Sequence, residues 1–234
     1  MNELVTKSDN SINGSRKKIS VTLSMLGVAT LFCLCLLGFR IIYAGKTGYL
    51  FLVWNLFLAI VPLIFAGIAE HFHRKNNTIF WLFGFLWLLF FPNSPYIVTD
   101  FMHLRVLVST VVPFWFDVMV IGSFAITGIL FGLCSLSVIG RITFKRFGIF
   151  WSWMFMIFVA LLSGFGIYLG RYLRWNSWDI FVSPNELFSD INQRITQPLS
   201  FPQTWIISLL FAALILCSYV VFNRFFEYKN RKNF

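Results

Sequence analysis

The sequence contains few charged residues, because Asp, Glu, Lys and Arg together make up only 12% of its 234 positions. A soluble domain usually carries about 25% charged residues and about 45–50% apolar residues. Here 58% of the residues are hydrophobic. This composition excludes an ordinary soluble enzyme and also a disordered protein, which has too little apolar surface to fold.

Cysteine and histidine are scarce as well. The four cysteines all lie inside apolar runs, so the sequence predicts neither a disulfide framework nor a cysteine-based zinc site in a loop. Of the three histidines, His71 and His73 follow Glu70 but are two residues apart and would point to different faces of a helix, and only His103 lies on the predicted outer face. We therefore expect no metal site and no cofactor.

Long apolar runs take the place of the missing charge. A membrane-spanning helix needs about 20 mostly apolar residues. Five runs reach this length, at 19–39, 49–69, 115–139, 148–169 and 204–222. A sixth, shorter run at 78–91 stops at Pro92 and spans a bilayer only if the residues after it also enter the bilayer. The sequence thus predicts an all-α fold, a polytopic membrane helical bundle of about six transmembrane helices.

The polar ends of the chain suggest three regions. Residues 1–18 are rich in Ser, Asn and Lys and are expected to form a mobile cytoplasmic tail. Residues 19–222 would form a single membrane-embedded domain. Residues 223–234 would be a basic cytoplasmic tail.

The basic residues predict the orientation in the membrane. With six spans, thirteen Lys and Arg residues lie on the side of the two termini and six on the other. The positive-inside rule then places both termini in the cytoplasm of a cell-membrane protein. The net charge of +10 is explained by this orientation, so no nucleic-acid partner is expected. A seventh span at 96–112 is the rival topology, but it would bury Asp100, His103 and Arg105 and would remove the charge bias.

The first of two unusual polar segments follows Pro92 on the predicted outer face. We expect a re-entrant or interfacial helix at about 96–112. In an α-helix, Tyr96, Asp100 and His103 would then share one face.

The second polar segment covers 170–179 and ends the fifth span. Arg171 and Arg174 are three residues apart and would share a helix face. Ser183 and Glu186 then match a capping box, which predicts a short outer helix over 184–194. Its Leu187 and Ile191 are expected to face the membrane.

These segments resemble a bacterial multi-pass membrane protein family catalogued as domain of unknown function 1361. The resemblance rests on Phe-Pro-Asn-Ser-Pro-Tyr-Ile-Val-Thr-Asp-Phe-Met-His-Leu at 91–104, Trp-Phe-Asp at 115–117 and Gly-Arg-Tyr-Leu-Arg-Trp-Asn-Ser-Trp-Asp at 170–179. It covers about residues 49–200 and implies a bacterial membrane protein. The family supplies no activity, substrate or assigned site.

The outer polar residues form the candidate site. Asp100 and His103 are the candidate general acid and base. Because guanidinium groups bind phosphate through paired donors, we expect an anionic or polyprenyl-linked lipid as ligand, beside the bilayer itself. Catalysis and non-catalytic binding both remain open. The alternative is an accessory or transport subunit in which a network of Asp and Arg residues, including Asp117, is structural. The candidate ligand-binding residues are Arg171, Arg174, Asp179, Tyr96, Asn93 and Asn176.

One polar residue stands inside the second apolar run. Asn55 interrupts that run and predicts either a helix irregularity or a polar contact between helices. The sequence does not identify protein partners.

Overall fold

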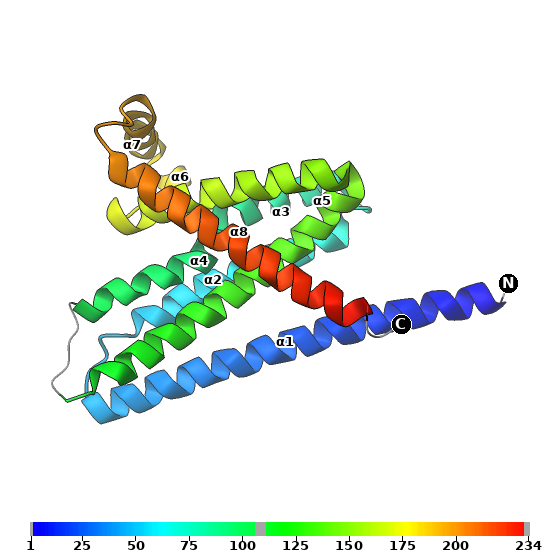
Figure 1. Ribbon diagram of the computed structural model, residues 1–234, viewed down its shortest axis with the longest axis horizontal. Helices are drawn as coiled ribbons and strands as arrows, with labels where there is room; N and C mark the ends of the chain where they lie inside the picture. Colours follow the sequence, from blue (N-terminus) through cyan, green and yellow to red (C-terminus); the bar gives the residue numbers. More distant parts are fainter. Residues whose placement is uncertain (1, 106–110, 232–234) are drawn as a thin grey trace.

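The computed structural model describes residues 2–105 and 111–231, and the described residues form helices and no strands. This confirms the predicted all-α fold. Figure 1 shows long helices running side by side, with α7 set apart at one end of the bundle. The elements are α1 (Asn2–Ala44), α2 (Phe51–Phe72), α3 (Asn77–Phe90), α4 (Asn93–Tyr96), the 3₁₀ helix η1 (Ile97–Arg105), α5 (Phe114–Tyr172), α6 (Asp179–Val182), α7 (Pro184–Thr196) and α8 (Pro202–Arg231).

Five of the described stretches are long and apolar enough to cross a bilayer, which makes the chain a membrane protein. Most side chains on these helices that face outward are apolar, as expected of surfaces that contact lipid. The stretches are Ser20–Ala44, Phe51–Phe72, Asn77–Leu104, Phe114–Tyr172 and Pro202–Arg224.

Helix α5 contains two of the predicted spans. Its 59 residues would extend roughly 89 Å as a straight helix, about twice the thickness of a bilayer. Gly148 breaks the helix with a φ of 83°, a conformation that glycine adopts without steric cost. The chain turns back there (Figure 1). The loop expected at 140–147 is helical instead, because no residue in it prevents an α-helix, and Gly148 alone makes the turn.

The short third run is completed by the residues after it. Pro92 ends α3 because proline cannot donate the next helical hydrogen bond. Helices α4 and η1 then continue toward the same end of the bundle, so the apolar stretch runs from Asn77 to Leu104 (Figure 1).

The helix expected over 96–112 differs from the observed one. It is a 3₁₀ helix that ends at Arg105, and residues 106–110 lie outside the described part of the chain. Thr99 donates to the carbonyl oxygen of Tyr96 at 2.7 Å, and such local bonds favour the tighter helix. One side of the segment packs into the bundle, where Ile97 and Asp100 are fully buried, while Phe101 and Met102 are exposed on its other side.

Small residues on α5 make room for this broken span. A Cβ atom added at Gly128 would lie 2.5 Å from Ile97, and one at Gly132 would lie 2.8 Å from Ser94. A Cβ atom added at Gly166 would lie 3.2 Å from Pro92, and one added at Gly170 would lie 3.2 Å from Tyr96. Glycine therefore permits the close approach of α5 to α4 and η1.

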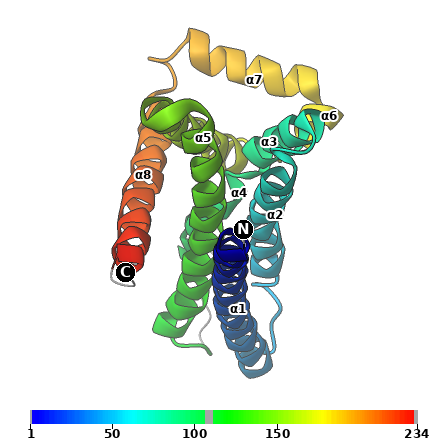
Figure 2. The ribbon, with the colours of Figure 1, turned by 90° about the vertical axis from the view of Figure 1, so that its right-hand side faces the viewer.

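Helix α7 lies crosswise to the long helices, at the end where α5 finishes and α8 begins (Figure 2). It starts at Pro184 as predicted, but the Ser183 side chain makes no capping hydrogen bond. Leu187 and Ile191 do not face the membrane as expected. They pack against Tyr168 and Leu169 of α5 instead.

Both chain ends lie at one end of the bundle, together with the α2–α3 connection and the Gly148 turn (Figure 1). The opposite end carries the α1–α2 connection, the end of η1, and α7. The two unusual polar segments of the sequence therefore belong to the same end of the molecule.

The contact between α5 and α8 yields a stability prediction. An added Cβ at Gly164 would overlap the backbone carbonyl of Ser208, so the two helices would have to separate. We expect Gly164→Ala to lower the free energy of unfolding by roughly 1–3 kcal/mol. Gly84→Ala is the matched control, because nothing lies within 4 Å of its added Cβ. Thermal unfolding in detergent, followed by circular dichroism, compares the two. Equal midpoints would contradict the packing described.

Candidate functional site

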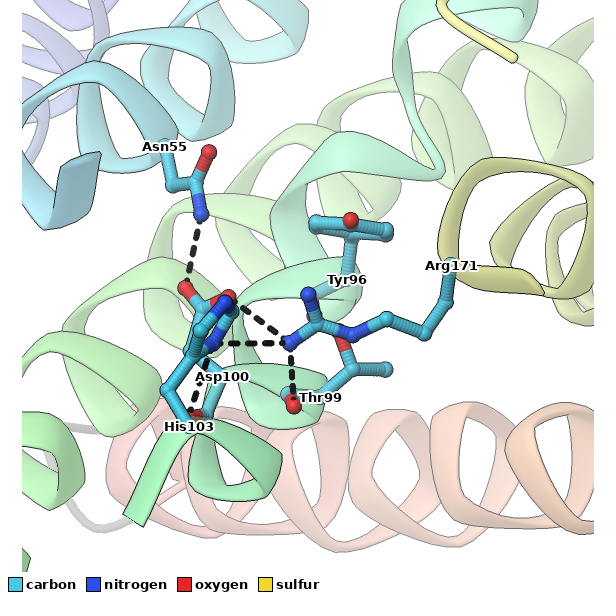
Figure 3. Close-up of polar contacts among 6 residues, drawn as sticks. All are labelled: Asn55, Tyr96, Thr99, Asp100, His103 and Arg171. Atoms are coloured by element: carbon cyan, nitrogen blue, oxygen red, sulfur yellow. Dashed lines mark hydrogen bonds and ion pairs between the residues drawn. The ribbon is translucent and has the colours of Figure 1, made fainter. Parts of the chain in front are cut away.

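The candidate site is centred on Arg171, in the last turn of α5, which reaches across to η1 (Figure 3). Its Nη2 atom lies 3.0 Å from Oδ1 of Asp100 and also donates to the carbonyl oxygen of Thr99. The same nitrogen lies 3.3 Å from Nδ1 of His103. Arg171 therefore binds three groups of η1 through one nitrogen, while its buried Nε has no hydrogen-bond partner.

Asp100 is fully buried and both of its carboxylate oxygens are occupied. Oδ1 accepts from Arg171, and Oδ2 accepts from Nδ2 of Asn55 on α2 at 2.7 Å. Three elements are thereby joined around one carboxylate. A charge in such an apolar environment is tolerated only when it is paired and hydrogen-bonded, and both conditions are met here.

Tyr96 forms one wall of the site. The guanidinium carbon of Arg171 lies 5.3 Å from the centre of the Tyr96 ring, within the range of a cation–π interaction. The ring edge in turn lies against Gly170, so Tyr96 holds the end of α5 next to η1.

His103 is the open part of the site, because 32% of its side chain is exposed. Its ring lies 4.4 Å from that of Phe51, measured between centroids. Its Nδ1 lies 3.3 Å from Nη2 of Arg171, which can only donate, and 3.3 Å from the backbone carbonyl oxygen of Asp100, which can only accept. Nδ1 of His103 therefore has a hydrogen-bond partner in either tautomer.

The remaining predicted residues form a neighbouring loop and do not join this cluster. Asp179 accepts from the backbone N–H of Asn176 at 2.6 Å and from its side chain at 3.1 Å. Asn93 donates to Ser177 at 3.0 Å and attaches this loop to the first residue of α4. Arg174 is exposed and has a φ of 65°.

The expectation that Arg171 and Arg174 share a helix face is wrong. Helix α5 ends at Tyr172, so Arg171 lies within the helix and Arg174 lies beyond its end. The two arginines therefore do not form a preformed pair on one helix face. The sequence pattern suggested a continuous helix because nothing before Arg174 is a helix breaker. The helix ends instead with the backbone N–H of Trp175 bonded to the carbonyl of Leu169, which requires a left-handed residue between them.

Two contributors were only partly visible in the sequence. Asn55 makes the predicted polar contact between helices, and its partner proves to be Asp100. The second is a separate buried ion pair, in which Nε of Arg40 lies 2.7 Å from Oδ1 of Asp117. The apolar run at 19–39 predicts a helix that ends just before Arg40, whereas α1 continues to Ala44 and includes Arg40.

Tyr49 completes this second pair. Its hydroxyl donates to Oδ2 of Asp117 at 3.3 Å, and the Arg40 guanidinium lies 3.8 Å from its ring centre. Burial, followed by the negative charge of Asp117, raises the pKa of Tyr49 above its usual value, so the phenol stays protonated and remains a donor. This cluster joins α1, the α1–α2 connection and α5, and it is closed to solvent.

Among residues 2–105 and 111–231, no three His, Cys, Asp or Glu side chains gather in a way that could hold a metal ion.

The fold and these buried ion pairs define a helical membrane protein with a polar cluster near one end of its bundle. The chain belongs to the family described as "Protein of unknown function (DUF1361)", whose model matches residues 54–218. The matched range contains the whole Asp100–His103–Arg171 cluster with Asn55, but only Asp117 of the second pair. No curated protein and no solved structure matches the chain.

The buried pair yields a second prediction. Arg171→Met leaves the Asp100 carboxylate buried without its cation and is expected to cost about 3–5 kcal/mol of stability. The Asp100→Leu/Arg171→Met double variant should regain much of this loss, because no unpaired charge remains.

Unfolding of the two single variants and the double variant gives a double-mutant cycle. Additive effects would show that Asp100 and Arg171 are not coupled. Arg174→Met is the matched control, and a change within about 0.5 kcal/mol is expected for this exposed side chain.

Proposed function

We propose that the cluster around Arg171 binds the phosphate-bearing head group of an anionic lipid or of a lipid-linked substrate. The observation that carries the proposal is the partly exposed His103, whose Nδ1 lies 3.3 Å from Nη2 of Arg171. The exposed Arg174 adds a guanidinium group near the same helix end. Such a set of N–H donors near a membrane surface suits phosphate oxygens.

The charge balance assigns different roles to the residues. Asp100 neutralises Arg171, so an anion would owe its attraction to the exposed Arg174 near the same helix end, while His103 supplies a hydrogen-bonding side chain. Asp100 is fully buried and cannot touch a ligand. It is therefore a positioning residue in this proposal, and His103 alone has the exposure that proton transfer requires.

Two tryptophans favour a lipid rather than a free anion. Trp54, next to Asn55 in the chain, lies edge-on to Trp178 at 6.5 Å between ring centres. Indole rings prefer the region between lipid head groups and acyl chains. Helix α2 and the 170–179 segment thus each contribute a residue to the polar cluster and a residue to this pair of tryptophans.

A second candidate function is an accessory or transport subunit in which the cluster is structural. The observation that favours it is the complete hydrogen bonding of Asp100 by Arg171 and Asn55. In that case the polar groups serve to join α2, η1 and α5, and no lipid head group is held.

Native mass spectrometry of protein extracted in a mild detergent tests the first proposal. Wild type should retain phosphate-bearing lipid, and His103→Leu and Arg174→Gln should each retain several-fold less, because the first removes a hydrogen-bonding side chain and the second a positive charge. Arg141→Gln is the matched control, since Arg141 is an exposed arginine at the other end of the bundle. Equal retention in all four proteins, with unchanged thermal unfolding, would favour the structural role.

We further propose a multi-pass protein of the bacterial cell membrane with both termini in the cytoplasm. The support is the excess of basic residues near the termini, the α2–α3 connection and the Gly148 turn, which lie at one end of the bundle. The Arg171 cluster would then open on the outer side.

Reporter fusions test this orientation. A fluorescent protein fused after Phe234 should fluoresce, and alkaline phosphatase fused there should be inactive, because the enzyme folds only outside the cytoplasm. Phosphatase inserted between Thr196 and Pro202, in the connection after α7, should be active. The reverse pattern would place the site in the cytoplasm.

A further inference from the structure

The segment between α5 and α8 exposes large apolar side chains although it lies outside the stretches that could cross a bilayer. Leu199, in the loop after α7, is 94% exposed, and Phe188 and Ile195 on α7 are each 57% exposed. Phe181 and Val182 on α6 are exposed as well. In water, this apolar surface would be unfavourable for so short a segment.

Helix α7 presents three different sides. Leu187, Ile191 and Arg194 lie toward the protein, where Leu187 and Ile191 pack on the end of α5. Phe188 and Ile195 are seven residues apart and therefore share a neighbouring side. The side beyond them is polar and includes Ser189 and Gln193. A helix that lies in a membrane interface needs this order of a protein side, an apolar side and a polar side.

The position of α7 in the chain supplies the apolar surroundings. It is connected to two stretches that contact lipid, since α5 ends at Tyr172 and the apolar part of α8 begins at Pro202. The exposed Leu199 is followed on α8 by the exposed Ile206 and Leu209, so apolar surface continues from this segment onto the span. Figure 2 shows α7 crosswise to the long helices, the direction of a helix that lies along a membrane surface.

We infer that α6, α7 and the loop to Leu199 lie in the interface of the bilayer that α5 and α8 span, with Phe188 and Ile195 inserted at the boundary of the acyl chains. The occupant of this apolar surface is therefore lipid. The inference rests on α7 and its neighbours and does not depend on a ligand at Arg171.

Polar contacts fix the position of α7 relative to the candidate site. Nε1 of Trp175 donates to Asp190 at 2.8 Å, and Asp190 forms an ion pair with Arg194 at the same distance. The Arg194 guanidinium lies 4.7 Å from the ring centre of Phe201, just before α8. The loop that carries Arg174 and Asp179 is thus attached to the interfacial helix.

Cysteine labelling in nanodiscs of phosphatidylcholine and phosphatidylglycerol tests the inference. A charged maleimide should react several-fold more slowly with Phe188→Cys and Ile195→Cys than with the matched control Ser189→Cys, which lies on the polar side. The four native cysteines lie in the spans, and wild type gives their baseline. Equal rates for the three variants would overturn the inference.

A second measurement identifies what covers the apolar side. A fluorophore attached through Phe188→Cys should be quenched by nitroxide lipids labelled near the carbonyl end of the acyl chain. It should be quenched less by lipids labelled near the methyl end. Slow labelling without quenching by either lipid would mean that protein, such as a second copy, covers α7, and would overturn lipid as the occupant. Labelling after denaturation in dodecyl sulfate should be equally fast at all three positions and confirms that each cysteine is reactive.

Discussion

The ion pair between Arg171 and Asp100 is the constraint on which this end of the molecule depends. A carboxylate with no exposed surface must keep a cation beside it, and here the cation comes from the last turn of α5. Asn55 occupies the other carboxylate oxygen and adds α2 to the same junction. The exposed His103 owes its orientation to this buried pair, so the stability of the bundle and the geometry of the candidate site have one cause.

Glycine permits that junction to form. Gly128 and Gly132 let the broken span of α4 and η1 approach the first arm of α5, and Gly166 and Gly170 let it approach the second. The polar cluster therefore lies between two arms of one helix that Gly148 folds back on itself. A larger residue at any of these contacts would separate the elements that Arg171 must bridge.

Hydropathy and charge predicted most of the architecture, because a bilayer demands long apolar helices. They also predicted Asp100, His103, Tyr96 and Arg171 as neighbours, since ionisable residues beside apolar runs need partners. Pairing across distant helices was not predictable: Arg40 finds Asp117, and Asn55 finds Asp100, through packing that has no local pattern. The residue at which α5 ends was not predictable either, because Arg174 adopts a left-handed conformation that no sequence pattern indicates.

The order of synthesis gives the two ion pairs a further meaning. Arg40 precedes Asp117 by 77 residues, and Asp100 precedes Arg171 by 71 residues. At a translation rate of about 5–20 residues per second, each first partner waits roughly 4–15 s for the second. During that interval the first partner lacks the counter-ion that it has in the folded protein. Asp117 lies in the first turn of α5 and Arg171 in its last turn, so synthesis of this one helix completes both pairs, one at its beginning and the other at its end.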